Sequence, residues 1–108
     1  MKNKKDEQET GCAINKLQKL IGGKWKIIIL WKLHCSTKRF GELYREIDNI
    51  TESMLTKQLR ELEADGFVKR YVYQEVPPKV EYSLDELGKK FIPILDELYE
   101  WSKENLKD

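Results

Sequence analysis

The sequence predicts a mainly α-helical fold that carries one small β-ribbon. Apolar residues recur at helical spacing through most of the 108 residues. Residues 67–84 alternate instead with period two around Pro77 and Pro78, which is typical of a hairpin with its tip at the prolines. Two short helical stretches joined by a four-residue turn, residues 48–51, come directly before this hairpin. This order of elements predicts a winged helix-turn-helix domain in which the hairpin is the wing.

The length and composition are those of a single small domain. One hydrophobic core is the most that 108 residues are expected to build, and 36% charged against 40% hydrophobic residues indicates a globular, soluble chain. The longest apolar run, residues 27–31, is too short to span a membrane, and the polar N-terminus has no signal-peptide pattern. The two cysteines lack a Cys-x-x-Cys spacing, so we expect a reducing, cytoplasmic location and no membrane partner.

Three helices are expected before the turn. Residues 1–11 are polar and mixed in charge, and we expect a flexible tail there, followed by one domain over residues 12–106. Gly22 and Gly23 end the first helix of that domain. The apolar residues that define the three helices are Ile14, Leu17, Leu20 and Ile21 in the first, Trp25, Ile28, Ile29 and Leu33 in the second, and Phe40, Leu43, Tyr44 and Ile47 in the third.

The helix after the turn, about residues 51–65, has two different faces. Leu55, Leu59 and Leu62 form one narrow stripe, because successive residues advance about 100° around a helix. The opposite face is short-chained, hydroxylic and basic, and it follows Thr51, the expected N-cap. It consists of Ser53, Lys57, Arg60 and Ala64, with Thr56 at its flank. An ordinary amphipathic surface helix has such a face too. Within a winged helix-turn-helix domain, however, this helix enters the major groove, where Arg and Lys donate to guanine edges.

The predicted wing, residues 67–84, and a last helix, residues 85–106, complete the domain. We expect Lys79 at the tip of the wing and Lys69 and Arg70 at its base, where they fit contacts to the DNA backbone or minor groove, although charged tips also serve solubility alone. Pro93 must either kink the last helix or restart it, and the sequence leaves both open. The apolar side of that helix consists of Leu87, Phe91, Ile94, Leu95, Leu98 and Trp101.

The net charge of +1 gives no sign of a nucleic-acid partner, but the charges are unevenly distributed. Eight Lys or Arg and a single acid, Glu42, lie between Lys16 and Arg45, whereas five acids and two lysines follow Pro93. A basic end and an acidic end suit a molecule that presents one face to a polyanion, although solvated helix faces produce the same pattern.

Several motifs occur in the order of one known family. They are GGKWKIIIL at residues 22–30, KRFGEL at 38–43, MLTKQLRELEADGFVKR at 54–70, EVPPKVEYSL at 75–84 and PILDELYEW at 93–101. Over residues 12–101 the chain resembles the HxlR-type family of bacterial winged helix-turn-helix regulators. The resemblance implies a homodimeric, sequence-specific DNA-binding transcriptional regulator that acts on an inverted-repeat operator. It also implies that residues 51–65 enter the major groove and that the N- and C-terminal helices are dimerisation helices.

We therefore expect two sets of functional residues. Independently of the resemblance, the apolar side chains near the two ends exceed what a three-helix core and a wing cover, which favours a dimer. The expected DNA contacts are Arg39, Thr51, Ser53, Thr56, Lys57, Arg60, Lys69, Arg70 and Lys79. The expected dimer contacts are Leu17, Leu20, Ile21, Leu95, Leu98, Tyr99 and Trp101.

Cys12 lies where many members of this family carry an N-terminal cysteine, which in some of them senses oxidants or electrophiles. We expect Cys12 next to a helix N-terminus and one turn before Lys16, two features that favour the reactive thiolate form of a cysteine. Oxidation or alkylation at this position is expected to change the dimer geometry. A cysteine is also a common small buried residue, and that alternative stays open.

Other classes of function find little support in the residues. The single histidine leaves no His-based catalytic pair, and GGK at residues 22–24 lacks the phosphate-loop pattern, so we expect no enzyme, no cofactor and no metal site. The alternative is a winged-helix module that binds proteins without reading DNA, which the near-neutral net charge and the acidic last helix favour. The expected partners are double-stranded DNA and a second copy of the chain, and the sequence identifies no small-molecule effector.

Overall fold

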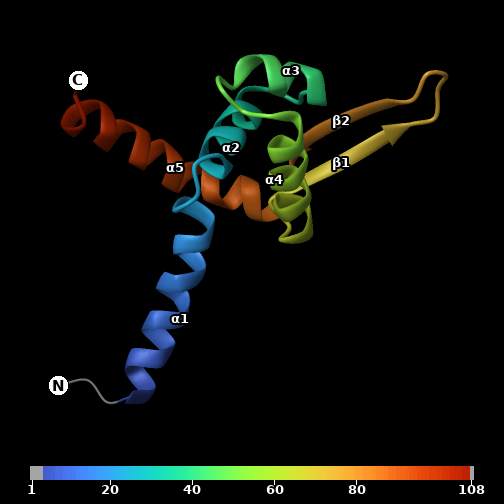
Figure 1. Cartoon of the computed structure of the whole chain (residues 1–108). Helices are drawn as coiled ribbons and strands as arrows, with labels where there is room; N and C mark the ends of the chain where they lie inside the picture. The colour runs from blue at the N-terminus through green and yellow to red at the C-terminus, as the bar shows by residue number, and fades with distance from the viewer. Residues whose placement is uncertain (1–3, 108) are drawn as a thin grey trace.

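The computed structural model describes residues 4–107, with side chains from residue 12 onward. The elements in chain order are α1 (Lys4–Ile21), α2 (Lys26–Cys35), α3 (Phe40–Glu46), α4 (Glu52–Ala64), β1 (Val68–Tyr73), β2 (Lys79–Leu84) and α5 (Glu86–Asn105). Figure 1 shows α2, α3, α4 and the first half of α5 gathered in one body, from which α1 and the β-ribbon project on different sides. The predicted class, mainly α-helical with a small β-ribbon in winged helix-turn-helix order, is confirmed.

One apolar core holds this body together. Leu55, Leu59 and Leu62, the stripe predicted on α4, are at most 2% exposed. Burying each leucine stabilises the fold by about 1.5–3 kcal/mol, so the three together fix the rotation of α4 about its axis. The other buried core residues are Ile29, Leu30 and Leu33 of α2, Leu43 of α3, Ile47 and Ile50 after it, Val68 of β1, and Phe91, Ile92 and Leu95 of α5.

Local signals set the two ends of α4. Asn49 has a φ of 67°, a left-handed conformation that Asn tolerates, and it turns the chain between α3 and α4. Thr51 is the N-cap, as predicted, because its Oγ1 accepts a hydrogen bond from the Met54 N–H at 3.1 Å. Gly66, with a φ of +84°, ends the helix in the conformation that glycine adopts most easily.

The wing is an antiparallel ribbon with the predicted alternation. Val68 lies opposite Leu84, Arg70 opposite Tyr82, and Val72 opposite Val80, so these six side chains share one face. Lys69, Tyr71 and Tyr73 are on the other face with their partners from β2. Val68 and the half-buried Leu84 anchor the base of the ribbon at the core, and the rest of β1 is exposed.

A single backbone bridge ties the wing to the segment that enters α3. The Lys38 N–H donates to the Tyr82 carbonyl at 3.0 Å, and the Tyr82 N–H donates to the Lys38 carbonyl at 2.7 Å. The side chain of Lys38 adds an ion pair with Glu46 at 3.1 Å. The sequence did not predict this bridge, because a one-residue pairing has no periodicity to detect.

The start of α5 packs closely against the base of the wing. The Asp85 N–H donates to the Phe67 carbonyl at 2.9 Å, and the Asp85 side chain caps α5 by accepting from the Glu86 N–H at 2.9 Å. Gly88 is buried at this contact, and a Cβ placed on it would lie 2.2 Å from the Phe67 carbonyl oxygen. Only glycine therefore fits this position without a shift of the backbone.

The last helix continues through Pro93. Residue 93 lies inside α5, so the proline does not divide the helix into two, and the question that the sequence left open is settled on this point. A proline has no N–H to donate to the carbonyl of Lys89. Lys89 is an exposed residue, where water is able to take the place of the missing donor.

The first helix begins earlier than we expected. A tail was predicted over residues 1–11, but α1 starts at Lys4; residues 1–3 lie outside the described range. The reason is that Lys, Glu and Gln, which dominate residues 4–9, are good helix formers. Because α1 leaves the body, the radius of gyration is 16.3 Å, against about 13 Å for a compact domain of this length.

Substitution of Gly88 tests the packing at the base of the wing. Gly88→Ala is expected to destabilise the domain by about 1–3 kcal/mol or more, because the atom that blocks the new Cβ belongs to the backbone and has little room to move. Gly23→Ala is the matched control, since a Cβ there meets no atom within 4 Å. Urea unfolding at a fixed protein concentration measures both variants, and equal stability would contradict the close approach of α5 to Phe67.

Substitution of Thr51 tests the cap of α4. Thr51→Ala is expected to lower the free energy of unfolding by about 1 kcal/mol, because the Met54 N–H loses its acceptor. Thr51→Ser keeps the hydroxyl oxygen and is expected to stay within about 0.5 kcal/mol of the parent. If thermal or urea unfolding shows the same loss for both variants, the methyl group rather than the cap is what stabilises this position.

Candidate nucleic-acid interface

The outward face of α4 is exposed and basic. Ser53, Lys57, Arg60 and Ala64 are exposed opposite the buried leucines, as the helical spacing predicted. Among the side chains of residues 12–107, neither Lys57 nor Arg60 forms an ion pair. Two cations on one helix face therefore remain available to an anionic or hydrogen-bonding partner.

The hydroxyl groups of this helix are already engaged within it. The half-buried Thr56 donates through Oγ1 to the Glu52 carbonyl at 2.9 Å. Ser53 Oγ lies 3.3 Å from Thr51 Oγ1, which also caps the helix. Glu52 places a carboxylate in the first turn of α4, where the helix N-terminus would otherwise attract a phosphate. Lys57 and Arg60 are therefore the residues of this face with the most freedom to contact a ligand.

A cleft of about 160 Å³ separates α4 from the wing. We name it the α4–wing cleft; Thr56, Leu59, Arg60 and Glu63 of α4 and Arg70 and Tyr82 of the wing line it. Arg70 Nε lies 3.9 Å from Glu63 Oε2, so one acid of α4 holds the arginine of the wing. Burial raises the pKa of Tyr82 above its ordinary value, and the positive charge of Arg70 partly opposes that rise. The hydroxyl of Tyr82 is therefore neutral at pH 7 and able to donate.

The basic residues of the wing do not act as one group. Lys69 and Arg70 are neighbours in β1 and so project from opposite faces of the ribbon. Lys79 was expected at the tip but is the first residue of β2, opposite Tyr73; residues 74–78 form the tip. Its Nζ lies 3.8 Å from Glu81 Oε1 and 4.7 Å from the centre of the Tyr73 ring. A hydrogen bond to the same Glu81 carboxylate raises the pKa of the Tyr73 hydroxyl.

Arg39 lies apart from α4 in the chain, at the start of α3. It is exposed, and its backbone N–H donates to Glu42 Oε1 at 2.8 Å. The structure thus brings Thr56, Arg60 and Arg70 around one cleft, whereas Arg39, Lys69 and Lys79 lie outside its lining.

The expected dimer residues divide into two groups. Leu17, Leu98, Tyr99 and Trp101 are between 42% and 55% exposed, and Leu20 and Ile21 are half-buried. Leu95 is different, because it is only 4% exposed within one chain and belongs to its core. The sequence predicts Leu95 among the dimer residues because it lies on the apolar side of the last helix. In α5 that side packs against the core at Leu95 and is exposed at Leu98 and Trp101.

The surroundings of Cys12 differ from the expectation. Since α1 begins at Lys4, Cys12 lies in the middle of the helix, where the field of the helix N-terminus is small. Cys12 is an exposed free thiol with Lys16 one helical turn further on, and so the alternative of a buried cysteine is wrong. Cys35 is also exposed, and its Sγ lies 3.6 Å from the Trp31 carbonyl oxygen.

Sequence reasoning missed two residues of the α4–wing cleft. Glu63 is an acid near the end of α4, and only the fold shows that it reaches Arg70. The alternation of the wing places Tyr82 on one of its two faces, but it does not show which face lies toward α4. Among residues 4–107 no helix has the length and apolar character needed to cross a membrane.

Comparisons with known proteins agree with this geometry. The family model described as HxlR-like helix-turn-helix matches residues 20–108. An uncharacterized HTH-type transcriptional regulator of Methanothermobacter thermautotrophicus is 50% identical over 97 residues, which cover 90% of this chain and 74% of the relative. The oxidized form of the redox regulator HypR has a TM-score of 0.82 and 49% identity over 90% of this chain and 99% of that one. Its reduced form has a TM-score of 0.82 and 48% identity, over 88% and 94% of the two chains.

The extent of these matches decides the family. The family model spans most of the chain, and a relative of 50% identity covers nine-tenths of it. The described elements are those of a winged helix-turn-helix domain, and the exposed basic face with Lys57 and Arg60 lies on the helix that such domains use for recognition. The chain belongs to the HxlR-like helix-turn-helix family and is a transcriptional regulator of the helix-turn-helix type.

Proposed function

We propose that this regulator binds DNA sequence-specifically as a homodimer, on an inverted-repeat operator in the cytoplasm, through the outward face of α4. The observation that carries the proposal is that Lys57 and Arg60 are exposed on α4 without an ion pair among the described side chains. The buried leucine stripe on the other side holds that face outward. Lys and Arg donors at this position are the type that reads guanine edges in the major groove.

The apolar surface of α1 and α5 supports the dimer. We name it the α1–α5 surface; its exposed members are Ile14, Leu17, Ile94, Leu98, Tyr99 and Trp101. Figure 1 shows α1 and the end of α5 leaving the body in different directions, so a single chain does not cover them. A second copy related by a two-fold axis would bury the same surface on both chains and present two α4 helices to DNA.

The wing contributes contacts to the DNA backbone in this proposal. Arg70 lines the α4–wing cleft across from Arg60, and a phosphate that binds Arg70 would compete with Glu63 for it. Lys69, near the base of the wing, and Lys79, near its tip, would also contact the backbone. Such contacts position the protein on the duplex, whereas base contacts from α4 select the sequence.

The proposal is tested by selecting the purified, reduced protein against a randomised duplex library and sequencing the bound fraction. We expect enrichment of an inverted repeat whose half-site centres are about 34 Å apart, which is one turn of DNA. Enrichment of a single half-site would contradict the dimer. No enrichment by a folded protein would contradict sequence-specific reading.

The module that binds proteins without reading DNA is the second candidate. The net charge of +1 and the acidic end of α5 are the observations that favour it. It predicts no affinity for any duplex at low salt, together with a stable complex recovered from nuclease-treated lysate. Affinity for DNA that falls steeply with salt would instead show that phosphates are contacted.

Substitutions at Arg60 and Lys79 separate base reading from backbone contact. Arg60→Ala is expected to weaken binding to the selected operator by about 1–3 kcal/mol, with little change on unrelated duplexes, if Arg60 donates to a guanine. Lys79→Ala is expected to weaken binding to all duplexes alike and to reduce the salt dependence of the binding affinity. Fluorescence anisotropy over a range of salt concentrations measures both. An equal loss on all sequences for Arg60→Ala would place Arg60 on a phosphate instead.

We further propose that modification of Cys12 controls the regulator. The similarity to a redox regulator solved in oxidized and reduced forms supports it, as does the exposure of Cys12 on α1, which carries part of the α1–α5 surface. A disulfide or an added group at this thiol would alter how two α1 helices pack and so change the spacing of the two α4 helices.

The two free thiols provide a matched test of this control. In the parent protein, treatment with diamide is expected to change the affinity for the selected operator. Cys12→Ser is expected to abolish that response, whereas Cys35→Ser is expected to retain it, because Cys35 lies on α2. Anisotropy before and after treatment measures the response. An unchanged response in Cys12→Ser would remove Cys12 from the switch.

A further inference from the structure

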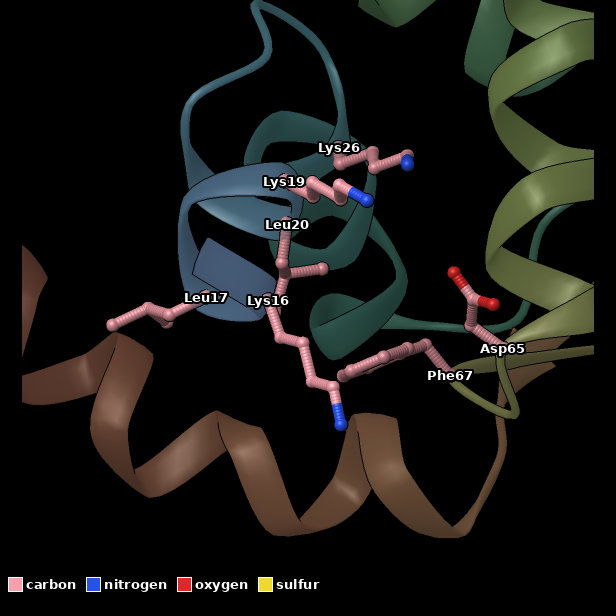
Figure 2. A pocket seen from close by; sticks show the side chains of 7 residues that line it. All are labelled: Lys16, Leu17, Lys19, Leu20, Lys26, Asp65 and Phe67. Carbon is pink, nitrogen blue, oxygen red and sulfur yellow. The ribbon is translucent and has the colours of Figure 1, made fainter. Parts of the chain in front are cut away.

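A groove of about 490 Å³ lies where α1 meets the start of α2 and the end of α4. We name it the lysine groove; it is lined by Lys16, Leu17, Lys19 and Leu20 of α1, Lys26 of α2, and Asp65 and Phe67 from the connection between α4 and β1. Leu17 also belongs to the α1–α5 surface, so the groove borders the proposed dimer contact. Figure 2 shows Lys19 and Lys26 extending in the same direction, toward the side where Asp65 lies. The volume is within the range of sites that hold small organic molecules.

The groove combines an apolar wall with an excess of positive charge. Leu20 and Phe67 are partly buried against the core and supply the wall. Three ammonium groups line the groove and a single carboxylate, Asp65, opposes them. Lys26 is held in place, since its side chain is only 13% exposed and its Nζ lies 3.9 Å from Glu61 Oε1. A ligand that fits must therefore be apolar at one end and negatively charged at the other.

We propose that the lysine groove binds a small organic acid. Its apolar body lies against Leu20 and Phe67, and its carboxylate lies between the ammonium groups of Lys19 and Lys26. A second space of about 400 Å³ shares Lys19, Lys26 and Asp65 with the groove and continues along the end of α4, where Glu61 and Ala64 also line it.

The position of the groove gives binding a regulatory consequence. One wall belongs to α1, which carries part of the α1–α5 surface, and the other wall is the segment that connects the recognition helix to the wing. An acid that bridges the two walls fixes the angle between them, and in a dimer that angle sets the distance between the two α4 helices. This consequence rests on the proposed DNA-binding function, whereas the binding of the acid itself does not.

The first experiment measures binding without DNA on the full chain. The probes are 4-phenylbutyrate and the uncharged 4-phenyl-1-butanol, titrated by two-dimensional NMR of labelled protein. We expect the acid to bind at least about tenfold more tightly than the alcohol, with saturable shifts at Leu20 and Phe67. Equal affinity for the two probes, or no binding of either, would overturn the proposal.

Matched variants locate the carboxylate. Lys19→Gln is expected to weaken the binding of the acid about tenfold and to leave the binding of the alcohol unchanged, because it removes the positive charge and keeps a polar side chain only one atom shorter. Lys89→Gln is the control, since Lys89 is exposed on α5 and does not line the groove; we expect it to bind both probes as the parent does. Equal binding of the acid by the parent and Lys19→Gln would overturn the assignment.

The regulatory consequence is then measured on the operator selected above. Saturating 4-phenylbutyrate is expected to shift the operator affinity of the parent severalfold and that of Lys19→Gln much less. If the acid binds but the operator affinity does not change, the groove binds the acid without any effect on DNA binding, and the proposed regulatory consequence is wrong. If the protein binds no operator at all, the proposed function fails while the NMR result stands.

Discussion

The burial of three leucines on one side of α4 is the constraint on which the rest of the domain depends. Leu55, Leu59 and Leu62 are spaced so that one face of the helix enters the core, and their near-complete burial leaves the helix no other rotation. Replacing any one of them by alanine is expected to cost about 2–5 kcal/mol, a large part of the stability of a small domain. The same packing that stabilises the fold therefore determines which side chains of α4 face outward.

The wing takes its position from the same core through backbone contacts. Val68 is buried beside the leucines, Tyr82 pairs with Lys38 ahead of α3, and Gly88 lets α5 approach the Phe67 carbonyl. These contacts place Arg70 and Tyr82 across a narrow cleft from Arg60. A two-stranded ribbon is marginal by itself, and the tie to Lys38 and the contact with α5 supply what it lacks.

Much of this arrangement was predictable from the sequence, because it depends on periodic patterns. The leucine stripe of α4, the Thr51 cap, the alternation of the wing and the order of elements all have local signatures. The bridge at Lys38 and the ion pair between Glu63 and Arg70 have none, since each joins single residues that the fold alone brings together. Leu95 was misplaced because periodicity identifies the apolar side of a helix but not where along it the core ends. The start of α1 was misplaced because polar helix formers resemble a tail.

The proposed function requires that two copies join through the α1–α5 surface and hold their α4 helices one turn of DNA apart. Pulsed electron–electron double resonance tests this geometry most directly. The spin label is attached at Lys57→Cys in a chain that also carries Cys12→Ser and Cys35→Ser. The account predicts a single distance between the two labels of about 30–45 Å, centred near one helical turn once the label arms are included. The absence of dipolar coupling, or a broad distribution well outside that range, would contradict it.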